Sequence, residues 1–177
     1  MAGIKFRVLL DSNQKEEVFC DILLSLDDNF ESFFNAIMKA YGFKGDQMAS
    51  FYASNENWDK GEELSLMDVS FGEEGTHKIM ATTTIREMVG EPEQKFILVY
   101  DFLKMWIFLI ECIGLQEEIP DVPSILLSVG EKPNEASKAL DEEFQMPTDF
   151  EEKEEGDEYG FDDFEDGFSE EDLSPYL

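Results

Sequence analysis

The sequence predicts an α+β fold. In this fold a mostly antiparallel sheet begins with an N-terminal hairpin and packs on one main helix, in an order like that of β-grasp folds, and a disordered acidic C-terminal tail follows. Three observations predict it. Apolar and polar residues alternate in two stretches near the N-terminus, and apolar residues then recur at helical spacing. The most apolar stretch of the chain, residues 96–115, divides into two strand-like halves.

The first two strands are predicted at Ile4–Leu10 and Val18–Leu26. In each of them every second residue is apolar, which is the pattern of a strand with one buried face. A short polar segment separates the two runs. We therefore expect them to pair as an antiparallel hairpin.

A helix is predicted over residues 28–41. Asp27 or Asp28 suits its N-terminus, and Asp28 and Glu31 stand at capping-box spacing. Gly42 follows the last apolar residue and is expected to end the helix. The apolar positions, which trace one helix face, are Phe30, Phe33, Phe34, Ile37, Met38 and Tyr41.

Shorter elements are predicted on either side of the apolar stretch. Strands are expected at residues 48–54 and 62–67, around a polar loop, and a brief strand is expected at the end of residues 70–80. Residues 83–89 suggest one or two helical turns. Beyond the apolar stretch, residues 124–129 (SILLSV) suit a short strand.

Residues 96–115 have the length of a membrane-spanning helix but not its composition. About 20 apolar residues are needed to cross a bilayer, whereas this stretch carries Asp101, Lys104 and Glu111. Each interior charge costs roughly 2.5–3.5 kcal/mol to insert. We therefore predict no membrane span, but two strands that meet at Leu103 and Lys104.

That turn sets a predicted register, with Tyr100 opposite Ile107 and Asp101 opposite Trp106. Two-residue hairpin turns favour Gly, Asn or Asp. Because the turn here is Leu-Lys, a looser four-residue loop is the expected variant. Both alternating sets of the second strand are apolar, which indicates a central strand covered on both faces.

The charge is strongly negative and unevenly distributed. The formal net charge is −29, of which residues 1–140 carry −13 (12 basic and 25 acidic residues) and residues 141–177 carry −16 (one basic and 17 acidic). Phosphate backbones are bound by clustered Lys and Arg. The sequence therefore predicts no direct nucleic-acid binding and a basic partner surface instead. We expect a domain over residues 1–140 and an acidic tail over residues 141–177.

The cysteines and the N-terminus indicate a cytoplasmic protein. Cys20 and Cys112 lie inside apolar, strand-like runs, which is typical of buried thiols in a reducing compartment. A disulfide between them is the less favoured alternative. The N-terminal segment lacks the basic region, long apolar core and cleavage site of a signal peptide.

Four short segments, FRVLL, AIMKAYGF, YDFLKMW and VGEKPNE, follow one another between Lys5 and Glu135. Together they resemble the plasmid pRiA4b ORF-3-like family, also called the transposon-passenger TnpR family. That family has an FxVxL strand, a helix that ends in an aromatic-Gly-aromatic step, a YDFGDxW signature and a later segment with Gly, Glu and Pro. The matching signature residues are Tyr100, Asp101, Phe102 and Trp106.

The resemblance implies a shared hairpin at the signature, with departures. Leu103 and Lys104 replace the Gly-Asp of the signature, and Phe108 replaces a histidine that often follows it. We expect Asp101 to accept a hydrogen bond, for example from the Trp106 indole, and so to lock the turn. Binding of a polar ligand by the altered signature is the less favoured alternative.

The sequence predicts no catalytic residue, no metal site and no cofactor. A serine recombinase, which the TnpR label suggests, surrounds its serine with several arginines, but only Arg7 and Arg86 are present. Cys20, His77 and Cys112 are isolated from one another, unlike zinc ligands. No phosphate-binding loop, EF-hand or Gly-x-Ser-x-Gly pattern occurs.

The tail carries aromatic residues among its carboxylates. Such a segment has too little apolar area to fold alone, and its simplest interpretation is a solubilising tail. Our sharper hypothesis is that its aromatic residues anchor it to a basic partner while its carboxylates steer the encounter. The predicted partner-binding residues are Phe150, Tyr159, Phe161, Phe164 and Phe168.

The favoured function is that of a non-enzymatic interaction or adaptor protein that binds a basic protein or ribonucleoprotein surface. The alternative is a mobile-element-associated DNA-processing enzyme or a hydrolase with an unrecognised active site. A pocket with convergent polar groups around His77 or Asp101 would favour that alternative. The sequence leaves the oligomeric state open.

Overall fold

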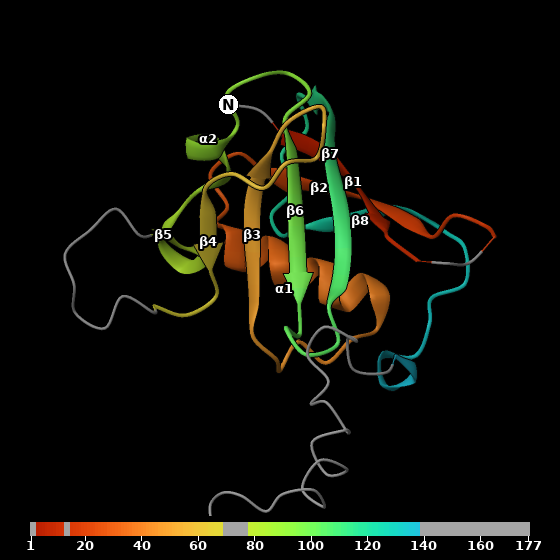
Figure 1. Cartoon of the computed structure of the whole chain (residues 1–177). Coiled ribbons are helices and arrows are strands. Elements are labelled where there is room, and N and C mark those ends of the chain that lie inside the picture. The colour runs from red at the N-terminus through yellow and green to blue at the C-terminus, as the bar shows by residue number, and fades with distance from the viewer. Residues whose placement is uncertain (1–2, 13–14, 69–77, 139–177) are drawn as a thin grey trace, which may run out of the picture. The chain divides into compact units, whose positions relative to one another are not determined.

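The computed structural model describes residues 3–12, 15–68 and 78–138, which form one sheet and a few helices (Figure 1). The sheet has eight strands in the order β5-β4-β3-β6-β7-β1-β2-β8. The strands are β1 Gly3–Leu10, β2 Phe19–Ser25, β3 Ala49–Ser54, β4 Glu63–Ser65, β5 Lys78–Ile79, β6 Lys95–Tyr100, β7 Trp106–Gln116 and β8 Ser124–Val129. The helices are α1 Phe30–Tyr41 and α2 Ile85–Met88, with single 3-10 turns η1 Met80–Thr82 and η2 Glu135–Ser137.

The pairings confirm the predicted α+β class with a mostly antiparallel sheet. Within the described strands, β4 and β5 pair in parallel and every other pair is antiparallel. The predicted N-terminal hairpin is β1–β2, with Val8 opposite Cys20. The predicted boundary at residue 140 and the predicted tail lie outside the described residues.

Helix α1 forms where the apolar period predicts it. It crosses one face of the sheet, which we call the covered face (Figure 1). The Phe33 ring stacks on Phe6 of β1 at a centroid distance of 4.9 Å and on Phe51 of β3 at 5.5 Å. Since all three rings are fully buried, α1 joins the two halves of the sheet through one aromatic core. Burial of such large side chains is the main stabilising term of the fold.

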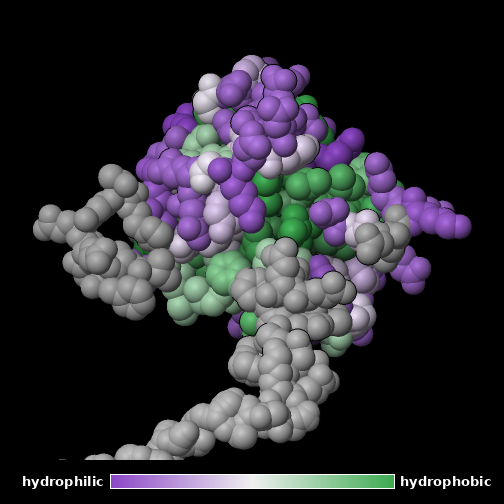
Figure 2. Space-filling view, in the orientation of Figure 1, coloured by the Kyte–Doolittle hydropathy of each residue, from purple (hydrophilic) through white to green (hydrophobic). Residues whose placement is uncertain are grey.

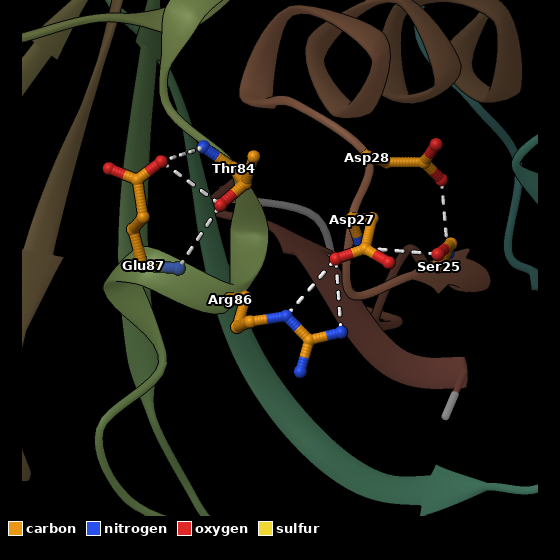
Figure 3. Close-up of polar contacts among 6 residues, drawn as sticks. All are labelled: Ser25, Asp27, Asp28, Thr84, Arg86 and Glu87. Atoms are coloured by element: carbon orange, nitrogen blue, oxygen red, sulfur yellow. Dashed lines mark hydrogen bonds and ion pairs between the residues drawn. The ribbon is translucent and has the colours of Figure 1, made fainter. Parts of the chain in front are cut away.

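The ends of α1 confirm one predicted signal and correct another. Gly42 takes a left-handed φ of 73°, and its N–H caps the last turn, as predicted. The N-cap, however, is Asn29, whose Oδ1 accepts a hydrogen bond from Ser32 N at 2.8 Å. The predicted cap and capping box at Asp28 are therefore wrong. Asp28 instead closes the preceding turn by accepting from Ser25 N at 2.9 Å (Figure 3).

The short helix α2 fastens the start of α1. Thr84 and Glu87 form a capping box at its N-terminus, and Arg86 forms an ion pair with Asp27 at 3.0 Å (Figure 3). The backbone of α2 also donates to the turn before α1, from Ile85 N to Asp28 O at 2.8 Å. The helical turn predicted at residues 83–89 thus anchors the β2–α1 connection.

The apolar stretch at residues 96–115 is the β6–β7 hairpin, as predicted, but the predicted register is wrong. Tyr100 pairs with Trp106 and Val99 with Ile107, so the register is shifted by one residue. The loop runs over Asp101–Met105, longer than the four residues expected. Its first and last residues both take left-handed φ angles, 66° and 57°. A wide loop tolerates Leu-Lys at its centre because these residues need no positive φ.

The side chains of β7 are buried on one face and only partly buried on the other, whereas the sequence predicted that both faces are covered. Phe108 and Ile110 are buried on the covered face, whereas Ile107 and Leu109 are only partly buried. These two belong to the face turned away from α1, which we call the open face. Figure 2 shows hydrophobic residues gathered at the centre of this face, over β6 and β7.

A row of alternating charges crosses the open face beside those aliphatic residues. Lys95, Glu111, Arg7 and Asp21 lie side by side on β6, β7, β1 and β2. Lys95 Nζ lies 3.2 Å from Glu111 Oε2, and Arg7 donates to both carboxylate oxygens of Asp21 at 2.8 and 2.9 Å. Opposite charges on neighbouring strands stabilise this pairing.

The helices that the structure describes include none with the length and apolar character needed to cross a membrane. The longest, α1, has 12 residues. The apolar stretch that has the length of a span is folded back on itself as the β6–β7 hairpin.

Candidate functional site

Three of the four segments that carry the family resemblance meet at one end of the sheet. They are the loop after α1, the β6–β7 loop and the residues around η2. We call this region the signature corner and define it by residues 42–47, 100–106 and 134–138. It is built where the ends of α1, β6 and β7 lie close together (Figure 1).

Tyr100 is the centre of the signature corner. Its ring is fully buried, and the ring centroid lies 6.0 Å from that of Phe43. Its hydroxyl donates to Glu135 Oε2 at 2.7 Å and accepts from Gly45 N at 3.0 Å, and Asp46 Oδ1 lies 3.4 Å away. Burial, and then the Glu135 carboxylate, raise the pKa of Tyr100 well above its ordinary value. The hydroxyl therefore keeps its proton and acts as a donor.

Glu135 links two loops through its two carboxylate oxygens. Oε2 takes the hydrogen bond from Tyr100, while Oε1 accepts from the backbone N–H of Lys44 at 2.7 Å. Asn134 supports this position, because its side chain accepts from Ala136 N at 2.8 Å and caps η2. The VGEKPNE segment is thus tied to the signature tyrosine itself.

Asp101 locks the β6–β7 loop, as predicted, but not through the predicted partner. Its Oδ1 accepts from the backbone N–H groups of Leu103 at 3.1 Å and Lys104 at 3.2 Å. The Asp101 side chain is 8% exposed and its φ is 66°. Asp tolerates this left-handed conformation better than most residues, which gives a physical reason for an aspartate at this position.

Trp106 does not donate to Asp101. Its indole Nε1 is buried and has no hydrogen-bond partner within the described part of the chain. The ring packs against Phe43 at 4.8 Å, and Lys138 Nζ lies 5.1 Å above it while donating to the Met105 carbonyl. Trp106 therefore holds the corner by packing. Phe102, the remaining matching residue, is partly buried in the loop.

A pocket of about 410 Å³ opens in the signature corner. Its walls bring together carboxylates from three loops, those of Asp46, Asp101 and Glu135, and the lysines Lys44 and Lys104. Groups of this kind bind polar or charged ligands by hydrogen bonds and ion pairs. Among the described residues no group of His, Cys, Asp and Glu is arranged to hold a metal ion.

The residues considered for catalysis are placed unfavourably for it. Arg7 and Arg86 both face carboxylates of this chain. Burial raises the pKa of Cys20 to about 12, and also raises that of Cys112, so both thiols stay protonated at neutral pH. Phe108, at the position of the family histidine, is fully buried 4.9 Å from the Tyr41 ring. His77 lies outside the described residues.

The predicted partner-binding aromatics of the tail also lie outside the described residues. They are Phe150, Tyr159, Phe161, Phe164 and Phe168. Among the described residues, sequence reasoning missed the role of Glu135. The sequence signal for Glu135 was its place in VGEKPNE, one of the four segments that carry the family resemblance, but the resemblance assigned no partner to this glutamate. The bond between Tyr100 and Glu135 joins residues 35 positions apart, and no local pattern predicts such a contact.

Comparisons with known proteins agree with this architecture. A crystal structure of a protein of unknown function, MM3350 from Methanosarcina mazei Go1, has a similar fold with a TM-score of 0.65 and 10% identity, covering 77% of this chain and 74% of that one. At this identity the likeness shows the fold alone. No curated protein matches the chain. The model of a protein family described as "Plasmid pRiA4b ORF-3-like protein" matches residues 2–172, which is nearly the whole sequence. The chain therefore belongs to the plasmid pRiA4b ORF-3-like family.

Proposed function

We propose that this protein is a non-enzymatic interaction or adaptor protein whose acidic surface and tail bind a basic protein or ribonucleoprotein surface. It would act in the cytoplasm and without direct contact to nucleic acid. The TnpR label, the β-grasp-like order and the division into a 1–140 domain and a 141–177 tail remain predictions beside this proposal.

The observation that carries the proposal is the pairing of cations within a strongly acidic chain. Arg7, Arg86 and Lys95 form ion pairs with carboxylates of this chain, at 2.8, 3.0 and 3.2 Å. A formal charge of −29 leaves a large excess of carboxylates for other contacts. Such a surface repels phosphate backbones and raises the encounter rate with basic surfaces.

The tail supplies the second part of the proposal. Its carboxylates would steer a basic partner, and its aromatic residues would then slow dissociation by burying their rings. Phe161, Phe164 and Phe168 stand at offsets 0, 3 and 7, so they would share one face if the tail became helical on binding. These two roles predict different kinetic effects.

The experiment compares two variants of the full chain against one probe, a surface-immobilised peptide rich in lysine and arginine. In the first variant Phe161, Phe164 and Phe168 become Ala, and in the second their neighbours Asp162, Asp163 and Asp166 become Asn. We expect the aromatic variant to dissociate faster and the aspartate variant to associate more slowly with a weaker salt dependence. Equal binding by the wild type and both variants, or saturable binding to duplex DNA at physiological salt, would refute the proposal.

One observation favours the enzymatic alternative, a hydrolase or DNA-processing enzyme. The signature-corner pocket brings polar groups together around Asp101, which is the arrangement named above as its signal. In this pocket the Glu135 carboxylate accepts a hydrogen bond from the Tyr100 hydroxyl at 2.7 Å, which makes Glu135 the candidate acid–base residue. The test is turnover of ester and phosphodiester substrates by the wild type and by Glu135→Gln. Turnover that Glu135→Gln abolishes in a still-folded protein would replace the adaptor proposal.

A further inference from the structure

The exposed apolar side chains of the described residues are concentrated in one part of the chain. All of the large ones except Met67 and Leu103 lie between residues 113 and 129. Exposed apolar side chains that gather in one place often mark an interaction site. The set consists of Ile113, Leu115, Ile119, Val122, Ile125, Leu126, Leu127 and Val129.

Strand β8 contributes half of this set and forms one edge of the sheet. One side of the strand pairs with β2, and its other side has no neighbouring strand among the described residues. Leu126 and Leu127 are 48% and 44% exposed. No charged residue occurs from residue 122 to residue 130. The strand therefore combines unpaired backbone groups with apolar side chains that bury little area within this chain.

The opposite edge of the sheet shows how proteins normally protect such a strand. Within the described part of the chain, strand β5 has two residues, one of them Lys78, and short or charged edge strands discourage pairing with other chains. Strand β8 is three times as long and uncharged. Its described protection is confined to its C-terminal end, where Lys132 Nζ contacts Ser128 Oγ and the Val129 carbonyl. The accessible part of the edge is therefore Ser124–Leu127.

The charges that flank β8 indicate which kind of chain segment would pair with its free edge. Glu117, Glu118 and Asp121 precede the uncharged stretch, and Glu131 and Lys132 follow it, so that four acidic residues and one basic residue flank the strand. A second copy of this chain would bring another net charge of −29 to the same place, which disfavours self-pairing. An apolar segment with lysine or arginine flanks would complement both the strand and its surroundings.

We infer that the free edge of β8 receives an extended apolar segment of the partner, flanked by basic residues, as an added strand. Backbone hydrogen bonds along Ser124–Leu127 supply affinity in this mode, and side-chain contacts with Leu126 and Leu127 supply selectivity. The inference rests on the proposed function, because the partner is basic in both. It adds the place and the mode of binding.

The test uses the full chain and a fluorescent synthetic peptide of alternating valine and threonine with lysines at both ends. Leu126→Lys removes apolar contact and adds a repulsive charge, whereas Met67→Lys makes a similar change at an exposed residue beyond β4. We expect the wild type and Met67→Lys to bind alike and Leu126→Lys to bind about tenfold more weakly or worse. Backbone amides of Ser124–Leu127 should gain protection from hydrogen exchange in the complex.

The controls separate this inference from the proposed function. A peptide with a central proline should bind weakly, because proline interrupts an added strand, and one with glutamate flanks should bind weakly because of charge. Basic-peptide binding that is unchanged in Leu126→Lys, or protection that appears only outside β8, overturns the inference and leaves the proposed function standing. Equal binding of the glutamate-flanked peptide overturns the basic-partner argument for both. A dimer that Leu126→Lys converts to monomer would show that a second copy occupies the edge.

Discussion

The two faces of the sheet use the same kinds of residue for different purposes. On the covered face, Phe6, Phe33 and Phe51 are fully buried, and the Phe33 ring stacks on each of the other two at centroid distances of 4.9 and 5.5 Å. On the open face, aliphatic residues range from buried (Val99) to partly buried (Leu109) beside a row of paired charges, and at the β8 edge they are exposed. The difference teaches that the covered face specifies the fold, while the open side keeps apolar area available for contact with other molecules.

The largest expected effect is a difference in the free energy of unfolding between a substitution on the covered face and a substitution on the open face. Phe33→Ala leaves a cavity in the aromatic core and should lower the free energy of unfolding by about 3–5 kcal/mol. Phe19→Ala removes a partly buried ring that lies under Arg7 at 4.6 Å on the open face, and should lower it by less than half as much. Chemical denaturation of both variants measures this contrast. Similar losses would show that the two faces contribute equally to the core.

The ion pair between Arg7 and Asp21 should give the next largest effect. Asp21 is 4% exposed, so Arg7→Met leaves a buried carboxylate without its bidentate partner and should cost about 1–3 kcal/mol. The double variant with Asp21→Leu should recover most of this loss, because no buried charge then remains unpaired. Urea titrations of the two single variants and the double variant form the measurement. A neutral Arg7→Met would mean that water reaches Asp21 on the open face.

Alkaline pH should weaken the covered face first. Burial raises the pKa of Tyr41 far above its ordinary value of 10.0, so the folded state holds a proton that the unfolded state releases. The contribution of Tyr41 to stability is therefore complete below pH 10 and is lost above it, by up to about 1.4 kcal/mol per pH unit. Tyr41→Phe should flatten that slope between pH 10 and 11.

Tyr52 provides the matched control for this titration. It is only partly buried on the open face, and its pKa is raised less strongly. Tyr52→Phe should therefore change the slope less than Tyr41→Phe does. Melting temperatures between pH 8 and 11 would test the order, and a larger effect at Tyr52 would reverse the comparison.

The contrast between the faces explains what the sequence could and could not predict. Regular apolar periods placed β1, β2 and α1 within two residues of their observed ends, because one buried face imposes that period directly. The β6–β7 register and the Asn29 cap were missed, since turn geometry and backbone hydrogen bonds decided them. The contact between Tyr100 and Glu135 depends on how three loops meet, which no local pattern encodes.

The smallest expected effect sharpens the comparison most. Leu127 of β8 is apolar but 44% exposed, so Leu127→Thr should change the free energy of unfolding by no more than about 0.5 kcal/mol. Threonine keeps a high strand propensity, so the change tests side-chain burial alone. Leu98→Thr, at a fully buried position of β6, is the matched control and should cost several times more. A loss at Leu127 close to that at Leu98 would place β8 in the core of this chain, and its apolar residues would then need no partner to explain them.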